Sequence, residues 1–346
     1  MFKEAFKYYK AKWPPPDLNG VIDFEEPSKT NHESTLVELQ DNVPGLHLSF
    51  PPIGLQPPQS WRCYALKSHP GILVIRNPFT VHGQRYWIAR SLRDYPRAPN
   101  RINLNENLFA SDAIKDWWNA LQQCDDKDEA RRLKISMRWA TLGYHHDWDT
   151  KVYSETMHTP FPQDLSNLCQ YIATVLGFAD FEAQAAIVNF YPIGTTLSGH
   201  TDHSEPNQTA PLFSFSFGQT AVFLIGGTTR EERPSALYLR SGDVLIMSQQ
   251  SRLCYHAVPR VMKTQEEPWN NLPADDADEK LMKPERKKLR RDFEDNSNVC
   301  DMSLYRLVRD DSFWLPYMHY LNDSRININV RQVLPSGVKQ LPLPPS

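Results

Sequence analysis

The sequence predicts an α+β protein whose core is an antiparallel jelly roll (a double-stranded β-helix) buttressed by helices that precede it. Two observations carry this prediction. Before about residue 180, several segments repeat apolar side chains at helical spacing. After that point the chain contains about eight short runs rich in β-branched and aromatic residues, separated by turn signals. Many short strands with turns between them are typical of a jelly roll or barrel.

The composition is that of a globular protein without a dominant charge. Of the 346 residues 40% are hydrophobic, and the net charge of −3 means that any nucleic-acid surface must be local. The five cysteines are far apart and form no C-x-x-C pair, which favours reduced thiols. No apolar run reaches the roughly 20 residues of a membrane span, and the N-terminus lacks a signal-peptide core. We expect an intracellular monomer without membrane contact, in the nucleus, cytoplasm or mitochondrion.

Helical periodicity appears in four segments of the first part of the chain, at residues 2–13, 81–95, 111–135 and 164–177. The first carries four lysines, which indicates a helix docked on the core with its lysines in water. The alternative is a basic lip beside a nucleic-acid groove. Residues 17–60 are Pro-rich and predict an extended wrap, and residues 71–75 form a short buried strand.

The predicted strands beyond this region cover residues 185–191, 195–202, 212–217, 221–225, 236–239, 244–247, 255–258 and 325–333. Gly218 and Gln219 lie between two of them and predict a hairpin. Residues 262–311 are polar, with an acidic part followed by the basic run 286–291, and predict a solvent-exposed, partly disordered insertion. The basic run could instead touch phosphate or act as a nuclear address.

These features divide the chain into four parts. Residues 1–60 hold the N-terminal helix and wrap, and residues 61–180 hold a helical buttress with a nucleotide-recognition lid. Residues 181–335 form the jelly-roll core with the insertion at 262–311, and residues 336–346 form a tail.

A candidate metal site begins at His200 and Asp202. Residues at i and i+2 of a strand point to the same face, so this imidazole and carboxylate lie together. A histidine from a later strand would complete a facial triad with open positions, and His256 is a candidate at a suitable distance along the chain. His-x-Asp alone is a weak signal, and a zinc hydrolase could use the same ligands.

The last predicted strand adds a second feature to this candidate site. Its residues Arg325, Asn327, Asn329 and Arg331 alternate, so that all four face one way. Two arginines on the inner face of a barrel are unfavourable without anionic partners, and a dicarboxylate cosubstrate supplies them. The alternative is an edge strand whose polar face lies in water.

An unusual aromatic stretch covers residues 138–149. It holds Tyr144, His146 and Trp148 with little helical periodicity, which indicates an aromatic loop that braces the core. The alternative is a lid whose rings stack a nucleobase, since every base presents a π-face.

Taken together, these motifs resemble the AlkB family of iron(II)/2-oxoglutarate dioxygenases over roughly residues 70–333. The residues that carry the resemblance are Asn189-x-Tyr191, His200-x-Asp202, Ser251-Arg-Leu-Cys-Tyr-His256 and Arg325-x-Asn-x-Asn-x-Arg331. The resemblance implies Fe(II) held by His200, Asp202 and His256. It also implies 2-oxoglutarate bound by Asn189, Tyr191, Arg325, Asn327 and Arg331, and O2 as the oxidant.

The resemblance further implies oxidative demethylation of nucleic acid, with hydroxylation of N-methyl groups on bases and release of formaldehyde. N1-methyladenine in tRNA, and N6-methyladenine or other N-methyl adducts in DNA, are the expected substrates. Tyr144, His146 and Trp148 are candidates for stacking the base. The bacterial type carries an acidic residue two places after the ligand aspartate, which contacts the base. This chain has Ser204 there, followed by Glu205, and both are further candidates for contact with the base. The identity of the base stays open.

Two other functions remain compatible with the sequence. The same chemistry could act on a protein side chain, or the chain could be a nucleic-acid-binding protein with an inactive iron site. The aromatic stretch and the basic segments argue against the first. The complete set of expected ligand and cosubstrate residues argues against the second.

Overall fold

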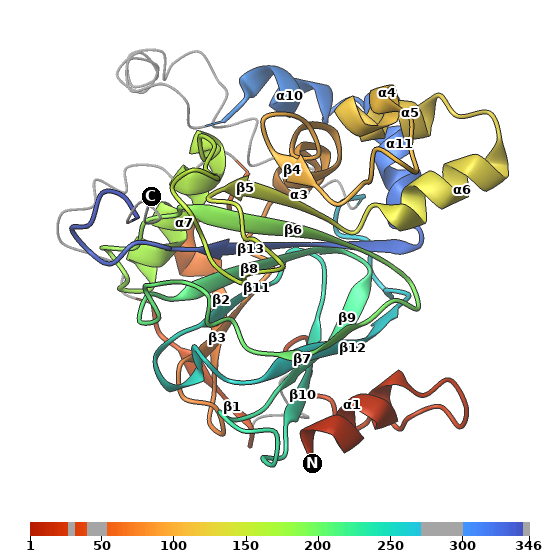
Figure 1. Cartoon of the computed structure of the whole chain (residues 1–346). Coiled ribbons are helices and arrows are strands. Elements are labelled where there is room, and N and C mark those ends of the chain that lie inside the picture. The colour runs from red at the N-terminus through yellow and green to blue at the C-terminus, as the bar shows by residue number, and fades with distance from the viewer. Residues whose placement is uncertain (27–31, 40–53, 271–299, 342–346) are drawn as a thin grey trace, which may run out of the picture.

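Two antiparallel β-sheets face each other in the computed structural model, which describes residues 1–26, 32–39, 54–270 and 300–341 (Figure 1). The larger sheet has the order β1-β2-β3-β11-β8-β13-β6-β5-β4, and the smaller has the order β10-β9-β12-β7. The strands of the larger sheet are β1 (Ser34–Val37), β2 (Arg62–Leu66), β3 (Ile72–Arg76), β4 (Arg101–Ile102), β5 (Trp139–Gly143), β6 (Ala185–Pro192), β8 (Leu212–Gly218), β11 (Val244–Met247) and β13 (Ser324–Arg331). Those of the smaller sheet are β7 (Leu197–His200), β9 (Thr220–Ile225), β10 (Ser235–Leu239) and β12 (His256–Met262).

Helices cover the outer face of the larger sheet, and α1 lies against the smaller one (Figure 1). The helices are α1 (Phe2–Lys10), α3 (Val81–Ala89), α4 (Ser111–Lys115), α5 (Trp117–Gln122), α6 (Lys127–Ser136), α7 (Gln163–Val175), α10 (Met302–Leu307) and α11 (Asp311–Leu321). A π-helical turn, Arg90–Asp94, continues α3. None of the described helices is long and apolar enough to cross a bilayer.

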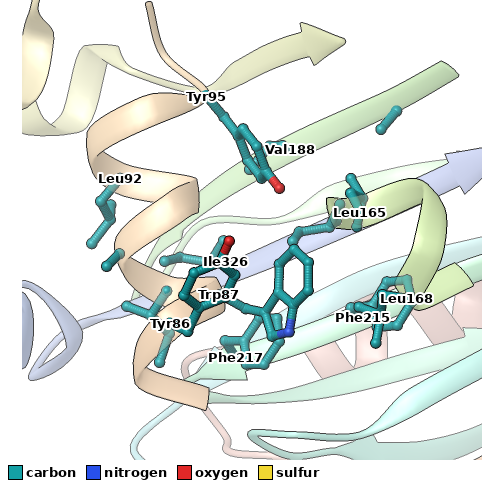
Figure 2. Packing of buried hydrophobic residues seen from close by; sticks show 14 of the residues in the cluster. Tyr86, Trp87, Leu92, Tyr95, Leu165, Leu168, Val188, Phe215, Phe217 and Ile326 are labelled. Carbon is teal, nitrogen blue, oxygen red and sulfur yellow. The ribbon is translucent and has the colours of Figure 1, made fainter. Parts of the chain in front are cut away.

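Strand β8 presents apolar side chains on one face of the larger sheet and polar side chains on the other. Successive side chains of a strand point to opposite faces, and here Phe213, Phe215 and Phe217 belong to the core beneath the helices. Ser214 and Ser216 alternate with them, so they face the smaller sheet. Figure 2 shows the helix-facing side, where residues of α3 and α7 pack on those of β6, β8 and β13. The other side is free to carry polar chemistry.

The helix α1 docks on the smaller sheet through its apolar side, and Phe2 is its most buried ring. Phe2 is 3% exposed and fills a notch above Gly199 and Gly226, where an added Cβ would lie 2.7 Å from ring atoms in both cases. Arg260 of β12 donates from Nε to the Tyr9 carbonyl at 2.8 Å, near the end of the helix. The expected docked helix is therefore present, and the four lysines of residues 2–13 are exposed.

Most predicted elements are confirmed. All eight strand-like runs after residue 180 correspond to β6–β13, and the helices expected at 2–13, 81–95 and 164–177 correspond to α1, α3 with its π-turn, and α7. The α+β jelly-roll fold is likewise confirmed. The helical region at 111–135 is three short helices, because Asp116 and Asp126 cap new helix starts with their side chains.

Three expectations are wrong. Gly218 and Gln219 do not make a hairpin, since β8 and β9 belong to different sheets and the chain crosses between them there. The aromatic stretch at 138–149 is not a loop throughout, because Trp139–Gly143 form strand β5. Strands β2 and β4 also lie within residues 61–180, beside the helices α3–α7. The alternative of an edge strand at the end is wrong too, because β13 lies between β6 and β8.

The predicted insertion at 262–311 is corrected at both ends. Trp269 is 1% exposed, and Leu304 and Tyr305 of α10 are fully buried in the core beneath the helices. Both ends of the predicted insertion therefore belong to the packed fold, because their apolar side chains are buried in the core. The acidic part and the basic run 286–291 lie outside the described residues.

Candidate metal and cosubstrate site

Two histidines from neighbouring strands meet at one end of the space between the sheets. His200 ends β7 and His256 begins β12, and the two are direct partners in the register of this strand pair. Their ring centroids are 4.3 Å apart. The ring of Phe223, from β9, stacks on His256 at 5.8 Å. Cross-strand pairing thus explains how residues 56 positions apart share one site.

Each imidazole is oriented by a backbone carbonyl two residues earlier. His200 Nδ1 lies 2.9 Å from the Ser198 carbonyl oxygen, and His256 Nδ1 lies 3.1 Å from that of Cys254. A ring nitrogen that faces a carbonyl carries the proton and donates it. The lone pair is then on Nε2 of both rings, which is the arrangement that carbonyl partners impose on metal-binding histidines.

Asp202 completes the group, two residues beyond the end of β7. Its Oδ1 lies 3.6 Å from His200 Nε2 and its Oδ2 lies 4.0 Å from His256 Nε2. One donor atom from each of the three residues lies within 4.8 Å of the others, and no other group of this kind occurs in the part of the chain that the structure describes. The three residues can therefore hold one metal ion from one side.

The local electrostatics suit a divalent cation. Burial and the neighbouring His200 lower the pKa of His256 to about 4, so its imidazole is neutral at physiological pH. Burial alone would raise the pKa of the Asp202 carboxyl, but Arg331 and the two histidines hold it well below its ordinary value. The site thus presents one carboxylate and two imidazoles, the donor set of the facial triad in iron oxygenases.

A buried arginine with unused donors lies farther inside the barrel. Arg325 of β13 is paired in register with Tyr191 of β6, and its guanidinium carbon lies 5.4 Å from the tyrosine ring centroid. Arg325 Nη2 donates to Ser216 Oγ at 2.8 Å. Arg325 Nε and Nη1 and the Tyr191 hydroxyl are buried, and none has a hydrogen-bond partner among the described residues.

This arrangement fits a carboxylate ligand. Burial lowers the pKa of Arg325 to about 10, which still leaves the guanidinium charged, and it raises the pKa of Tyr191 to about 12. A buried cation with two free N–H groups beside a free hydroxyl is unfavourable until an anion pairs with it. One end of a dicarboxylate supplies that charge through short, charge-assisted hydrogen bonds.

The two asparagines predicted to contact the cosubstrate are cross-strand partners. Asn189 of β6 is half-buried and lies opposite Asn327 of β13. Asn327 Nδ2 already donates to Ser214 Oγ at 2.9 Å and to the Phe215 carbonyl at 2.8 Å. The amide nitrogen of Asn327 therefore ties β13 to β8, whereas Asn189 lies two residues before Tyr191 and so shares its face of β6.

Ser204 and Glu205 have different surroundings. Ser204 Oγ lies 3.1 Å from His146 Nε2, so Ser204 contacts the aromatic stretch. Glu205 is 3% exposed and its carboxylate meets Arg252, Arg331 and the Tyr153 hydroxyl. Because its charge is enclosed by these partners, Glu205 is not free to contact a base, contrary to the expectation from sequence.

The aromatic stretch forms one wall beside the triad. His146 makes edge-to-face contacts with Trp148 at 4.7 Å and with Tyr153 at 5.3 Å. Trp148 is 49% exposed and also contacts Trp139 of β5 at 5.4 Å. These rings are named the aromatic wall below.

Tyr144 is the exception among the predicted stacking residues. Its ring is 4% exposed, stacks on His158 at 4.1 Å, and donates its hydroxyl to Glu155 at 2.7 Å. It belongs to an apolar cluster with Tyr153, Val333, Leu334 and Leu341. Because the ring is buried and already stacks on His158, the predicted stacking of a base on Tyr144 is wrong.

Sequence reasoning missed three residues at this site. Arg252 lay inside the Ser251-Arg-Leu motif but had no assigned partner, and it donates to the Asp202 carbonyl at 2.7 Å. Tyr153 reaches Glu205 from beyond the aromatic stretch. Ser216 alternates with buried phenylalanines on β8, and that pattern would have revealed it as the partner of Arg325.

A jelly roll that combines a His-Asp-His group with a buried arginine, whose Nε and Nη1 have no partner among the described residues, defines the class of non-haem iron oxygenases that use a dicarboxylate cosubstrate. Comparison with known families agrees, since the family described as the 2OG-Fe(II) oxygenase superfamily matches residues 71–331. The chain belongs to this family. The predicted Fe(II), 2-oxoglutarate and O2 follow from that membership, and the three donor residues fit the metal.

Curated relatives place the chain within the AlkB-like part of the family, as its motifs predicted. It is 38% identical to the human "Nucleic acid dioxygenase ALKBH1", over 99% of this chain and 86% of that protein. It is 32% identical to "tRNA demethylase abh1" of Schizosaccharomyces pombe, over 76% of this chain and 85% of that protein. It is 28% identical to "DNA N(6)-methyladenine demethylase ALKBH1A" of Arabidopsis thaliana, over 94% and 90%.

Proposed function

We propose that this protein is an oxidative demethylase of nucleic acid, which hydroxylates N-methyl groups on bases so that formaldehyde leaves. The observation that carries the proposal is the aromatic wall, whose half-exposed Trp148 stands beside His146 next to the triad. A flat, apolar surface at this position suits a base that has left its stack. The names of the three relatives, which cover nucleic acid, tRNA and DNA, support the same class of substrate.

In this proposal each residue of the site has one role. His200, Asp202 and His256 hold Fe(II), which supplies the oxidising chemistry when 2-oxoglutarate and O2 are bound. Arg325 and Tyr191 bind the distal carboxylate through their unused buried donors. The metal-proximal carboxylate would lie near Arg331, which also holds Asp202. Asn189 would donate a hydrogen bond to the cosubstrate, and Asn327 would act indirectly through its hydrogen bond to Ser214.

The candidate residues for the base are His146, Trp148 and Ser204. The hydrogen bond between His146 and Ser204 joins the aromatic wall to the segment that carries Asp202. N1-methyladenine in tRNA is the substrate we favour, ahead of N6-methyladenine or other N-methyl adducts in DNA. Unpaired or loop bases need less energy to leave their stack than paired ones do.

The decisive test measures both products in one reaction. Protein loaded anaerobically with Fe(II) receives 2-oxoglutarate, O2 and methylated oligonucleotides, and succinate and methyl loss are followed by mass spectrometry. The panel contains N1-methyladenine in a tRNA stem-loop and N6-methyladenine in single-stranded and bulged DNA. We expect methyl loss that requires both iron and 2-oxoglutarate. Asp202→Asn should abolish it, whereas Asp149→Asn, a change at an exposed position, should not.

Other results would point elsewhere. Succinate formed without methyl loss would contradict the nucleic-acid substrate and favour oxidation of a protein side chain. Iron binding without either product would favour a binding protein with an inactive centre. The proposal further holds that the enzyme is an intracellular monomer, which sedimentation and cell fractionation would check.

A further inference from the structure

Two buried arginines hold Asp202 at different atoms. Arg331 Nη2 donates to the side-chain oxygen Oδ2 at 2.7 Å, and Arg252 Nη1 donates to the backbone carbonyl oxygen at 2.7 Å. Arg252 Nε also donates to the Ala210 carbonyl at 3.0 Å. Asp202 is therefore fixed both from the end of β13 and from the turn before β12.

Both arginines also meet Glu205. Arg252 Nη2 donates to Glu205 Oε2 at 3.0 Å, and Arg331 Nε lies 3.1 Å from Glu205 Oε1. The same Oε1 accepts a hydrogen bond from the Tyr153 hydroxyl at 3.1 Å. The cluster thus holds two positive and two negative side chains. A buried cluster of this kind is balanced only while all of its members are present.

Arg331 is consequently shared between two carboxylates. A metal ion at the triad competes with Arg331 for Asp202, because both are cations that bind the same carboxylate. Without the Glu205 charge, Asp202 would be the single carboxylate left to the two arginines, and its pair with Arg331 would become stronger. Loss of Glu205 should then weaken metal binding, although its own side chain is not among the three donors.

We propose that Glu205 is a positioning residue of the metal site, which engages Arg331 and Arg252 so that the Asp202 carboxylate stays available to the metal. This role rests on the proposed function of Asp202 as a ligand. It also accounts for a buried glutamate that faces two arginines rather than the mouth of the site.

Metal affinity tests this role without any turnover. In Glu205→Gln the size of the side chain is kept and its charge is lost. Measured by calorimetry with Mn(II), the metal dissociation constant should rise about 10- to 100-fold, the range seen when outer partners of metal ligands are changed. Glu155→Gln is the matched control. Glu155 also accepts from a tyrosine hydroxyl, and its other described partner is the Leu341 amide, so this variant should bind Mn(II) like the wild type.

The outcomes separate this role from the proposed function. Unchanged Mn(II) affinity in folded Glu205→Gln would overturn it. If that variant does not fold, Tyr153→Phe decides, because it removes one donor from Glu205 Oε1 and so strengthens the ion pair of that oxygen with Arg331. Its Mn(II) affinity should stay equal or rise, and a fall would show that the cluster only supports the loop. A wild type that binds no Mn(II) would instead overturn the metal site itself.

Discussion

At the scale of single residues, the pairing of Arg325 with Tyr191 is the feature most specific to a dicarboxylate. Both are buried on the inner face of adjacent strands, and both keep hydrogen-bonding atoms without partners among the described residues. Such atoms are rare in native proteins unless a ligand pairs with them. Arg325 and Tyr191 are more deeply buried than His200 and Asp202, which suits a ligand whose two ends bind different groups.

Removing the Tyr191 hydroxyl tests this interpretation. In Tyr191→Phe the ring is kept and one donor is lost, so we expect the KM for 2-oxoglutarate to rise about tenfold, since a hydrogen bond to a charged group contributes ~1.5 kcal/mol. The Mn(II) affinity should not change. Tyr144→Phe, a buried tyrosine outside the site, is the control for loss of a hydroxyl. An equal rise of KM in both variants would contradict a direct contact.

A second residue-scale prediction concerns His145, which lies between Thr141 Oγ1 at 2.8 Å and Thr159 Oγ1 at 3.1 Å. Burial and the nearby Arg101 lower its pKa to about 4. Between this value and the ordinary histidine pKa near 6.5, the unfolded chain binds the proton and the folded chain does not. Stability is therefore full above pH 6.5 and falls as the pH drops toward 4.

We expect this histidine to contribute about 1–2 kcal/mol to the loss of stability between pH 7 and 5. Urea unfolding at both pH values gives the free energy of unfolding of the wild type and of His145→Gln. Between pH 7 and 5 the variant should lose less stability than the wild type, by the amount that His145 contributes. His319→Gln, at an exposed position of α11, should keep the wild-type pH dependence. An equal loss of stability between pH 7 and 5 in the wild type and in His145→Gln would contradict the prediction.

At the scale of elements, α1 and the strand that carries His200 form one packed unit. Phe2 occupies the notch above Gly199, directly before the metal-site residue, and Gly226 lines the same notch. The helix contacts both β7 and β12, the two strands that supply the histidines. The absence of a Cβ at residue 199 is thus a requirement of helix docking, because a methyl group there would meet the phenylalanine ring.

A double-mutant cycle tests this contact. Gly199→Ala should cost about 1–3 kcal/mol, because the added Cβ overpacks the notch. Phe2→Ala should cost about 2–4 kcal/mol through the cavity that it leaves. The double variant should cost clearly less than the sum, since the alanine methyl group then fills space that the ring has vacated. Urea unfolding gives the three values, and simple additivity would show that the two residues do not meet.

At the scale of the whole molecule, the site depends on both sheets together. The smaller sheet supplies His200 and His256, and the larger sheet supplies Arg325, Arg331 and Tyr191. We propose that residues 181–335 form the catalytic core, with residues 61–180 as its buttress and lid, although strands β2–β5 of that segment belong to the larger sheet. Ligands that bind both sheets should therefore stabilise the entire fold.

Thermal unfolding measures this linkage. Mn(II) with N-oxalylglycine, an inert analogue of 2-oxoglutarate, should raise the Tm of the wild type by several degrees, because ligand at 100 times its Kd contributes about 2.7 kcal/mol. Asp202→Asn should show little rise. Mn(II) alone should give a smaller rise than the two ligands together. A shift of the same size in Asp202→Asn would mean that the ligands bind elsewhere.

The sequence alone determined the jelly-roll class, the eight later strands, and the triad with its arginine strand. Strand periodicity fixes which side chains share a face, so alternation within β13 and the His-x-Asp spacing could be read without coordinates. The family resemblance of those same motifs then supplied the iron and the cosubstrate.

Only the tertiary structure decided which residues meet across distant segments. It showed that β8 and β9 lie in different sheets, that Tyr144 is buried against His158, and that Glu205 faces two arginines. Each of these outcomes depends on contacts between segments far apart in the chain. Local propensity and spacing carry no information about such contacts, because packing between elements selects among conformations that are equally acceptable locally.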